Sequence, residues 1–252
     1  MKFIKPHTLF LVSIFLGLFL YSCQKDTPKP SDHSPLVLTF KTHVDGKIFD
    51  IGKDIYYDDK GRNYRVEMLK FYLSNWMLEK QDGTMLPIAD VYLIDYSQNE
   101  DLTLSLSVEK GAYVNLHFGV GLDSMTNATD PVIYAPEHPL STAQNTYWTW
   151  SSTYKFFMLE GRVDTSSGEN PNQPFSYHSG FNNLYRIITL PLNDLFMGDE
   201  GASLNLQMDL AKVLSGHAGT VDFVEEPFSH SEDDIEMIQT LSNNLTNAFT
   251  IN

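Results

Sequence analysis

The sequence predicts an all-β protein: an antiparallel β-sandwich of about eight or more strands, with long loops and one C-terminal helix. Apolar and polar residues alternate at a period of two in several segments, which is typical of half-buried strands. Gly, Asn and Asp separate many of these segments at short spacing. A helical spacing occurs only near the end of the chain, so no helices alternate with the strands. This pattern favours a sandwich or barrel.

The first residues predict an export signal. Lys2 and Lys5 precede an apolar run over residues 9–21, which is too short to span a bilayer comfortably. The run ends at Leu20-Tyr21-Ser22-Cys23, which resembles a bacterial lipobox, and Cys23 is the only cysteine. We therefore expect residues 1–22 to be a signal peptide and Cys23 to carry a lipid. The alternative, a secreted protein without an anchor, would leave an unpaired thiol.

The residues after Cys23 predict where the lipoprotein goes and how it is tethered. Gln24-Lys25-Asp26 resembles the export signal of Bacteroidetes-type bacteria, which indicates an outer membrane lipoprotein displayed at the surface. The periplasmic leaflet is the alternative. Residues 27–35 are rich in Pro and Ser, so residues 23–35 are expected to form a lipidated tether. Membrane contact is then expected through the lipid anchor.

The charge excludes one class of partner. The formal charge is −15, and removal of residues 1–22 with Lys2 and Lys5 brings it to −17. Nucleic acids need a basic face, so a nucleic-acid partner is not expected. No disulfide is possible with one cysteine, so stability must come from a buried core.

Residues 36–252 are expected to form a single domain, because neither an internal repeat nor a boundary is visible. The first strand shows the alternation most clearly, with Leu36, Leu38 and Phe40 on one face and His43 on the other. The sequence predicts strands at residues 36–44, 66–78, 91–96, 102–108, 112–120, 148–160, 185–190 and 203–210. Long irregular stretches at residues 123–146 and 164–181 are of the kind that often carries function.

The predicted helix covers residues 232–249. Ile235, Ile238, Leu241 and Leu245 recur at a spacing of three to four residues, and acidic residues occupy the first turn. We expect this apolar face to pack on the β domain.

The usual catalytic motifs are absent from the sequence. It contains no phosphate-binding loop, no GxSxG, no HExxH and no Cys/His zinc framework. Adjacent acidic pairs such as Asp58-Asp59 are most often solvated. The protein is therefore not expected to be an enzyme.

Histidine is the remaining candidate for chemistry, because imidazole is a common ligand of copper and zinc. His43 lies on the polar face of its strand, and His178 follows a long loop at the rim of the fold. His138 lies within the other long loop. His117 lies in a strongly apolar strand and is expected to be buried and hydrogen-bonded instead.

Three segments in order resemble the MbnP-like family of methanobactin-associated, periplasmic copper-binding proteins. They are LKFYLSN at residues 69–75, KGAYVNLHFGVG at residues 110–121 and YWTWSSTYKF at residues 147–156. The resemblance implies a β-sandwich in the cell envelope that binds copper with the help of histidines. It also implies a dihaem cytochrome c peroxidase-like partner that oxidises a tryptophan to kynurenine. Trp148 and Trp150 match the W-x-W segment of the family, whereas Thr146 and Thr153 depart from its pattern.

The expected function is therefore binding of copper or another transition metal at one end of the sandwich. His43 and His178 are the predicted ligands, with His138 closing over them and a kynurenine derived from Trp148 or Trp150 nearby. Glu160 and Asp209 are expected to orient an imidazole through its second nitrogen. A different class of function remains open: a surface adhesin or glycan-binding module that uses an aromatic-rich groove, since 13% of the residues are aromatic.

Overall fold

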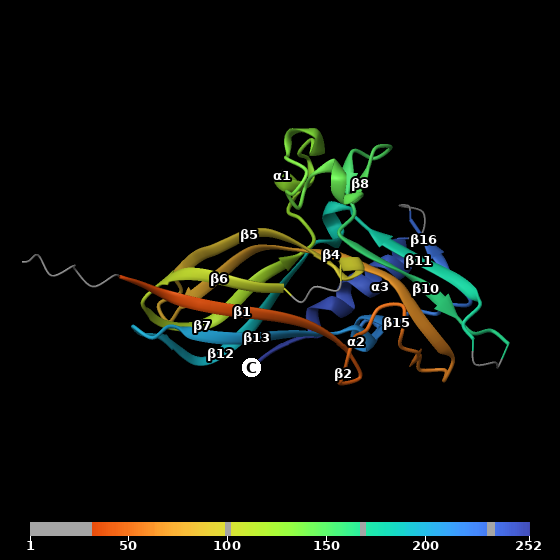
Figure 1. The fold of residues 1–252 in the computed structure, drawn as a ribbon, viewed down its shortest axis with the longest axis horizontal. Coiled ribbons are helices and arrows are strands. Elements are labelled where there is room, and N and C mark those ends of the chain that lie inside the picture. The colour runs from red at the N-terminus through yellow and green to blue at the C-terminus, as the bar shows by residue number, and fades with distance from the viewer. Residues whose placement is uncertain (1–31, 99–101, 167–169, 231–234) are drawn as a thin grey trace, which may run out of the picture. The chain divides into compact units, whose positions relative to one another are not determined.

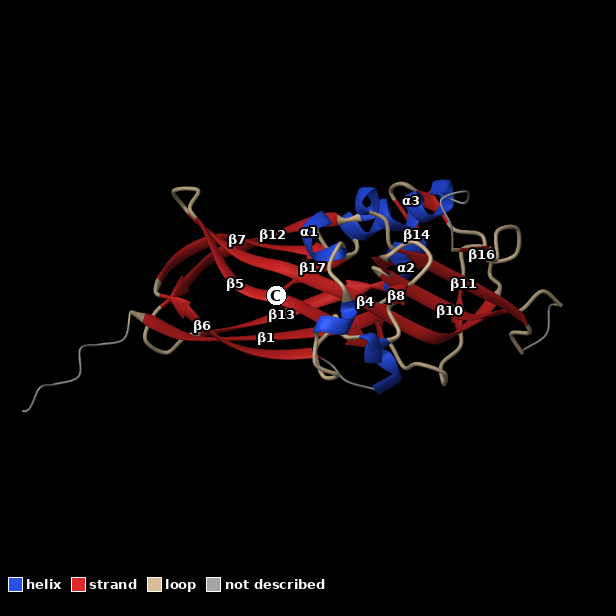
Figure 2. Ribbon diagram, turned by 90° about the horizontal axis from the view of Figure 1, so that it is seen from above, coloured by secondary structure: helices blue, strands red, loops and turns tan. Residues whose placement is uncertain are grey.

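Two β-sheets pack against each other in the computed structural model, which describes residues 32–98, 102–166, 170–230 and 235–252 (Figures 1 and 2). The predicted signal peptide, Cys23 and most of the predicted tether lie outside the described residues. Residues Asp32–Asn252 form one compact unit. Within the described part of the chain, no helix combines the length and the apolar character needed to cross a membrane.

The first sheet is built around β1 (His33–Val44), with β6 (Leu102–Glu109) on one side and β13 (Ala202–Asp209) on the other. β1 runs parallel to β13 and antiparallel to β6. Two short strands complete the sheet, namely β2 (Lys47–Ile48) and β17 (Phe249–Ile251). Leu36, Leu38 and Phe40 are fully buried, which confirms the predicted inner face. β1 begins at His33, so the strand includes the last three residues of the predicted tether.

The second sheet is built around β4 (Asn63–Lys80), the longest strand. Along one half, β4 lies between β5 (Met85–Asp95) and β7 (Gly111–Val120). Along the other half, it pairs with β10. The remaining strands of this sheet are β3 (Tyr56–Tyr57), β10 (Phe157–Val163), β11 (Gln173–Ser179), β12 (Arg186–Met197) and β16 (Phe228–Ser229).

Aromatic rings from both sheets fill the space between them. Phe40 of β1 meets Phe71 of β4 edge to face at 5.9 Å. Phe118 of β7 stacks on Trp76 at 4.8 Å and contacts Phe249 of β17 at 5.2 Å. These contacts join the two inner faces directly, as in a β-sandwich. The all-β sandwich-like fold predicted from the sequence is therefore confirmed.

The prediction of one strand over residues 148–160 is wrong. The segment forms a tight hairpin, β8 (Tyr147–Trp148) with β9 (Thr153–Tyr154), followed by the separate strand β10. Ser152 takes a left-handed backbone conformation with φ 54°, which turns the chain. Aromatic and β-branched residues on both sides of Ser151-Ser152 hid this turn in the sequence.

The prediction of an irregular stretch over residues 164–181 is also wrong in part, because β11 occupies residues 173–179. The stretch at residues 123–146 does lack strands. It contains only α1 (Ser124–Asn127) and the 3₁₀ turns η2 (Pro131–Ile133) and η3 (Thr142–Gln144).

Residues 123–156 form an excursion that packs on the face of β4 opposite the main core. A second apolar cluster holds it there, consisting of Tyr72, Leu122, Leu140, Tyr154 and Phe156. Figure 1 shows α1 and β8 standing together above β4 and β5. The excursion thus places the paired tryptophans at the surface of the second sheet.

The C-terminal segment covers one end of the sandwich with helical elements. α2 (Leu210–Leu214) directly follows β13, and the small hairpin of β14 (Ser215–Gly216) and β15 (Gly219–Thr220) follows α2. The other short 3₁₀ turns are η1 (Tyr96–Gln98), η4 (Asn182–Leu184) and η6 (Leu245–Asn247).

The predicted helix is α3 (Ile235–Asn244), shorter than the 232–249 expected, and residues 232–234 lie outside the described part. Of the predicted apolar face, Ile238, Leu241 and Leu245 are buried, whereas Ile235 at the start of the helix is half-buried. After the helix, Phe249–Ile251 joins the first sheet as β17, and Phe249 packs on Phe40 in the core.

We predict that Leu241→Ala destabilises the whole domain by about 2–5 kcal/mol, because it empties a fully buried site between α3 and the sheets. Urea unfolding followed by tryptophan fluorescence measures the change. Glu236→Ala on the exposed face of α3 is the control and should stay within about 0.5 kcal/mol of the parent. Equal stability of the Leu241→Ala variant and the parent would show that α3 is not part of the cooperative core.

Candidate functional site

Trp148 and Trp150 lie close together but in different environments. Trp148 of β8 is 8% exposed, whereas Trp150 in the following turn is 63% exposed. Their ring centroids are 5.4 Å apart. Trp148 also stacks on Phe181 at 5.7 Å, and a Cβ at Gly180 would collide with its indole. The buried indole therefore lies against the end of β11, and the exposed one faces solvent beside it.

Buried polar groups fix the hairpin that carries Trp148. Asn127 of α1 accepts the backbone N–H of Tyr154 at 2.8 Å and donates to the side chain of Asn182 at 2.8 Å. Tyr72 of β4 places its hydroxyl 2.6 Å from that of Thr146 and donates to the carbonyl of Pro139 at 2.9 Å. Thr146, where the chain departs from the family pattern, thus helps to anchor the excursion to β4.

His178 is the predicted site residue closest to these indoles. Its ring lies 6.5 Å from the ring of Trp148. Glu160 of the neighbouring strand β10 places Oε1 2.8 Å from Nε2 of His178. Because a carboxylate only accepts hydrogen bonds, Nε2 carries the proton in the neutral imidazole. The lone pair of His178 is therefore on Nδ1.

His230 faces that lone pair. The Nδ1 atoms of His178 and His230 are 3.2 Å apart and form a hydrogen bond, in which Nδ1 of His230 donates to the lone pair of His178, and the two rings meet edge to face at 4.7 Å. The pairing of β11 with β16 brings them together, since Ser176 pairs with Phe228 and Tyr177 with Ser229 in parallel register. His178 directly follows Tyr177, and His230 directly follows Ser229, so the same register places the two histidines side by side. The sequence analysis did not assign His230 to the site.

Burial keeps the imidazole of His178 neutral. Desolvation lowers the pKa of His178 from 6.5 to about 4, although the carboxylate of Glu160 acts in the opposite direction. A neutral imidazole is the form that ligates a metal ion. At neutral pH the lone pair of His178 on Nδ1 is therefore directed at His230.

The spacing of the two nitrogens fits a shared metal ion. Two imidazole nitrogens bonded to one tetrahedral ion at about 2.0 Å each lie roughly 3.3 Å apart. The two Nδ1 atoms are 3.2 Å apart in their hydrogen bond, so an ion that took the place of the shared proton would need only a small change in this separation. Glu160 contacts the opposite nitrogen of His178, which is the usual arrangement of a carboxylate that orients a metal-bound histidine. The donor set fits copper or zinc.

The structure does not bring the other two predicted histidines to this pair. His43 lies on β1 in the first sheet, in register with Asp209 and Ile48, and its buried Nδ1 has no hydrogen bond. His138 stacks on Tyr134 at 4.2 Å, and its Nδ1 accepts the backbone N–H of Leu140. No set of three or more His, Cys, Asp or Glu side chains in the described ranges is arranged to hold a metal ion.

The two carboxylates predicted to orient an imidazole have different roles. Glu160 does contact His178, as expected. Asp209 instead caps α2, where Oδ1 accepts the backbone N–H groups of Ala211 and Asp45 at 3.1 Å each. No hydrogen bond joins Asp209 to an imidazole among the described residues, although Asp209 lies in register with His43.

His117 forms hydrogen bonds as predicted, but it is half-buried rather than buried. Its Nε2 lies 2.9 Å from Glu79, and its Nδ1 lies 2.9 Å from the hydroxyl of Thr189. Both ring nitrogens have partners, so this histidine has a structural role.

We predict that metal-free protein loses stability as the pH falls from about 6.5 towards about 4 and that His178 accounts for part of the loss. The pKa of His178 is lower in the folded state than in the unfolded state, so the unfolded chain takes up the proton first. Urea unfolding at about pH 7.5 and about pH 5 measures the difference in stability. His178→Gln should make this difference smaller. An unchanged difference would show that His178 is not buried as described.

Comparisons with known proteins agree with the fold. The sequence model of the family described as MbnP matches residues 33–233. Among solved structures, the chain is similar to MbnP from Methylosinus trichosporium, with 15% identity and a TM-score of 0.53, over 76% of this chain and 81% of that one. The comparison with curated proteins gave no match. Because the family match covers most of the sequence, the chain belongs to the MbnP family.

Proposed function

We propose that this protein is a cell-envelope lipoprotein that binds copper, is not itself an enzyme, and uses His178 and His230 as ligands. The observation that carries the proposal is the 3.2 Å separation of their Nδ1 atoms, with Glu160 on the far nitrogen of His178. The copper function implied by the resemblance to the MbnP-like family supports it.

The electrostatics of the pair favour a soft, imidazole-binding ion. Neutral imidazoles suit copper and zinc, whereas hard cations such as calcium prefer oxygen ligands. A bound copper ion would supply redox or storage chemistry. The residues of this chain hold the pair in place: Glu160 fixes the tautomer of His178, and Trp148 packs beside it.

The position of the neighbouring tryptophans supports the proposal that a kynurenine, formed from one of them after folding, is a further copper ligand. Trp148 lies 6.5 Å from the His178 ring, and Trp150 is open to solvent beside it. Kynurenine carries an aryl amine and a ketone, and either group could complete a coordination shell that begins with two histidines. The oxidising equivalents would come from the dihaem cytochrome c peroxidase-like partner that the family resemblance implies.

We predict that His178→Ala or His230→Ala weakens copper binding by more than about a hundredfold. Glu160→Gln should cost less, about 10–100-fold, because it acts only by orienting His178. The double histidine variant should bind little worse than either single variant, since ligands of one ion act as a unit. Competition with a chelator of known affinity measures each value.

Three further histidines serve as comparisons in the same experiment. His117→Ala removes a histidine whose two nitrogens bind Glu79 and Thr189, so copper affinity should not change. His43→Ala and His138→Ala should also bind as the parent does. If these two variants lose copper while His230→Ala keeps it, the ligand assignment is wrong. If the parent binds no copper at all, the adhesin or glycan-binding alternative gains support.

Protein purified from its own host tests the tryptophan modification. Conversion to kynurenine removes one carbon and adds one oxygen, which intact mass and peptide mapping detect at Trp148 or Trp150. Protein made without the partner should lack this change. An unmodified peptide from the host would leave the two histidines as the proposed ligands and exclude the kynurenine.

We predict that Cys23→Ala releases the protein from membranes, because the anchor is proposed to be a lipid on this thiol. Fractionation at high salt measures the release, since no basic patch is expected to hold the acidic chain on anionic lipid. Replacing Lys25 and Asp26 by Ala should leave the protein lipidated but less accessible to protease on whole cells. Retention of the Cys23→Ala variant in the membrane fraction would contradict the lipid anchor.

A further inference from the structure

A separate cavity of about 320 Å³ opens at the end of the sandwich where α2 follows β13. Its walls come from the turn after β1, from β3 and the residues after it, from Tyr64 of β4, from Asp209 at the end of β13, from α2 and β14, and from Val221 and Phe223. His178 and His230 are not among the residues that line it. The cavity is thus distinct from the proposed copper site.

Carboxylates dominate the charge of this cavity. Asp45, Asp58, Asp59 and Asp209 line it together with a single cationic side chain, Lys212. Asp58 is neutralised by Arg62, which binds it at 2.7 Å. The other three carboxylates face the cavity without a bound Lys or Arg among the described residues. The lining therefore keeps an excess of negative charge.

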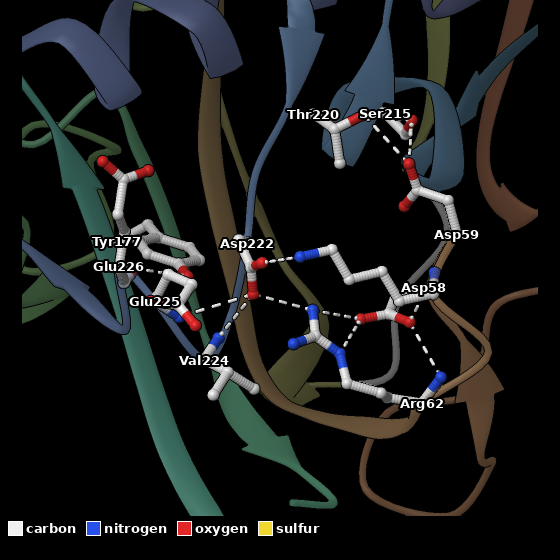
Figure 3. Close-up of polar contacts among 11 residues, drawn as sticks. Asp58, Asp59, Arg62, Tyr177, Ser215, Thr220, Asp222, Val224, Glu225 and Glu226 are labelled. Atoms are coloured by element: carbon white, nitrogen blue, oxygen red, sulfur yellow. Dashed lines mark hydrogen bonds and ion pairs between the residues drawn. The ribbon is translucent and has the colours of Figure 1, made fainter.

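Two of these carboxylates are held in place by hydrogen bonds to one oxygen, and the second oxygen of each accepts no hydrogen bond from the described residues. Oδ2 of Asp59 accepts hydrogen bonds from the hydroxyls of Ser215 and Thr220, as Figure 3 shows. Asp209 uses Oδ1 for the amides at the start of α2 and in the turn after β1. Asp45 makes no side-chain hydrogen bond or ion pair in the part of the chain that the structure describes. The cavity thus presents positioned acceptors.

The hydroxyl of Tyr64 is the second feature that points to a ligand. Tyr64 is 1% exposed and lines the cavity, yet its hydroxyl bonds to no described residue. Burial, together with the charges of Asp45 and Asp209, raises the pKa of this phenol, so the hydroxyl stays protonated. The side chain is buried while its hydroxyl opens only into the cavity, so a polar ligand there would form a hydrogen bond with it.

The shape of the site decides between a metal ion and an organic cation. The carboxylates are not clustered on one point, since no three His, Cys, Asp or Glu side chains of the described residues are placed to share an ion. The rings of Tyr57, Tyr64 and Phe223 also line the cavity. Tyr64 and Phe223 are buried against other rings, whereas Tyr57 is 64% exposed, so its ring is the face that an ammonium group could contact beside the carboxylates. We infer that this cavity binds a small organic cation with primary ammonium groups.

Spermidine is the probe for this inference, titrated calorimetrically at low ionic strength into the metal-free mature protein. Asp45→Asn removes one charge and keeps a residue that tolerates the left-handed backbone at φ 49°. Tyr64→Phe removes only the hydroxyl. Each variant should bind spermidine about tenfold more weakly than the parent. Lys212→Met should bind it more tightly, because it removes the opposing charge.

The control is Asp90→Asn, which makes the same charge change at an exposed position on β5, outside the cavity. It should bind spermidine as the parent does. Equal weakening by Asp45→Asn and Asp90→Asn would show that the acidic surface binds the amine without a site, which overturns the inference. Absence of spermidine binding by the parent, or binding of calcium in its place, would overturn it as well. Copper affinity should be unchanged in every one of these variants, so this test is independent of the copper proposal.

Discussion

The fold depends on the pairing of β4, which serves as the shared strand of both halves of the second sheet. One half of β4 pairs with β5 and β7, and the other pairs with β10. The residues Phe71–Ser74 at the junction are buried on both faces of the sheet. At Asn75 the backbone takes φ 52°, and the register shifts beyond it, which bends the strand. The side chain of Asn75 binds Asp123 and Tyr185, so the bend is held by residues from other elements.

The same strand couples the core to the site of the paired tryptophans. Phe71 points into the sandwich and packs on Phe40, whereas Tyr72 points to the opposite face and bonds to Thr146. The hairpin with Trp148 is therefore supported by a residue next to the central core, although the hairpin itself is short. Such support from a rigid strand positions a surface site more precisely than a loop alone. β11, which carries His178, pairs with β10, and β10 pairs with β4.

The two candidate sites differ in the chemistry of their donors. His178 and His230 are half-buried, burial keeps the imidazole of His178 neutral, and the carboxylate of Glu160 lies on the far side of its ring. The cavity near Tyr64 is lined by carboxylates and aromatic rings. A soft transition metal suits the first, and an ammonium group suits the second. Both sites use groups that the sandwich brings together from segments far apart in the sequence, and neither shares a residue with the other.

The sequence by itself determined the fold class, the inner face of β1 and the buried face of α3, because these follow from local periodicity of apolar residues. The three segments quoted for the resemblance also indicated the family, and they placed Trp148 and Trp150 in the region of the site. The turn at Ser152 escaped this reading, because its flanking residues favour strands. Only the tertiary structure paired His178 with His230, through the parallel contact of β11 and β16 across more than fifty residues of chain. Only the tertiary structure also placed His43 in the other sheet and used Asp209 as a helix cap. A local pattern predicts on which face of a strand a side chain lies. The neighbours of that side chain depend on strand order and register, which are set by the packing of the whole chain.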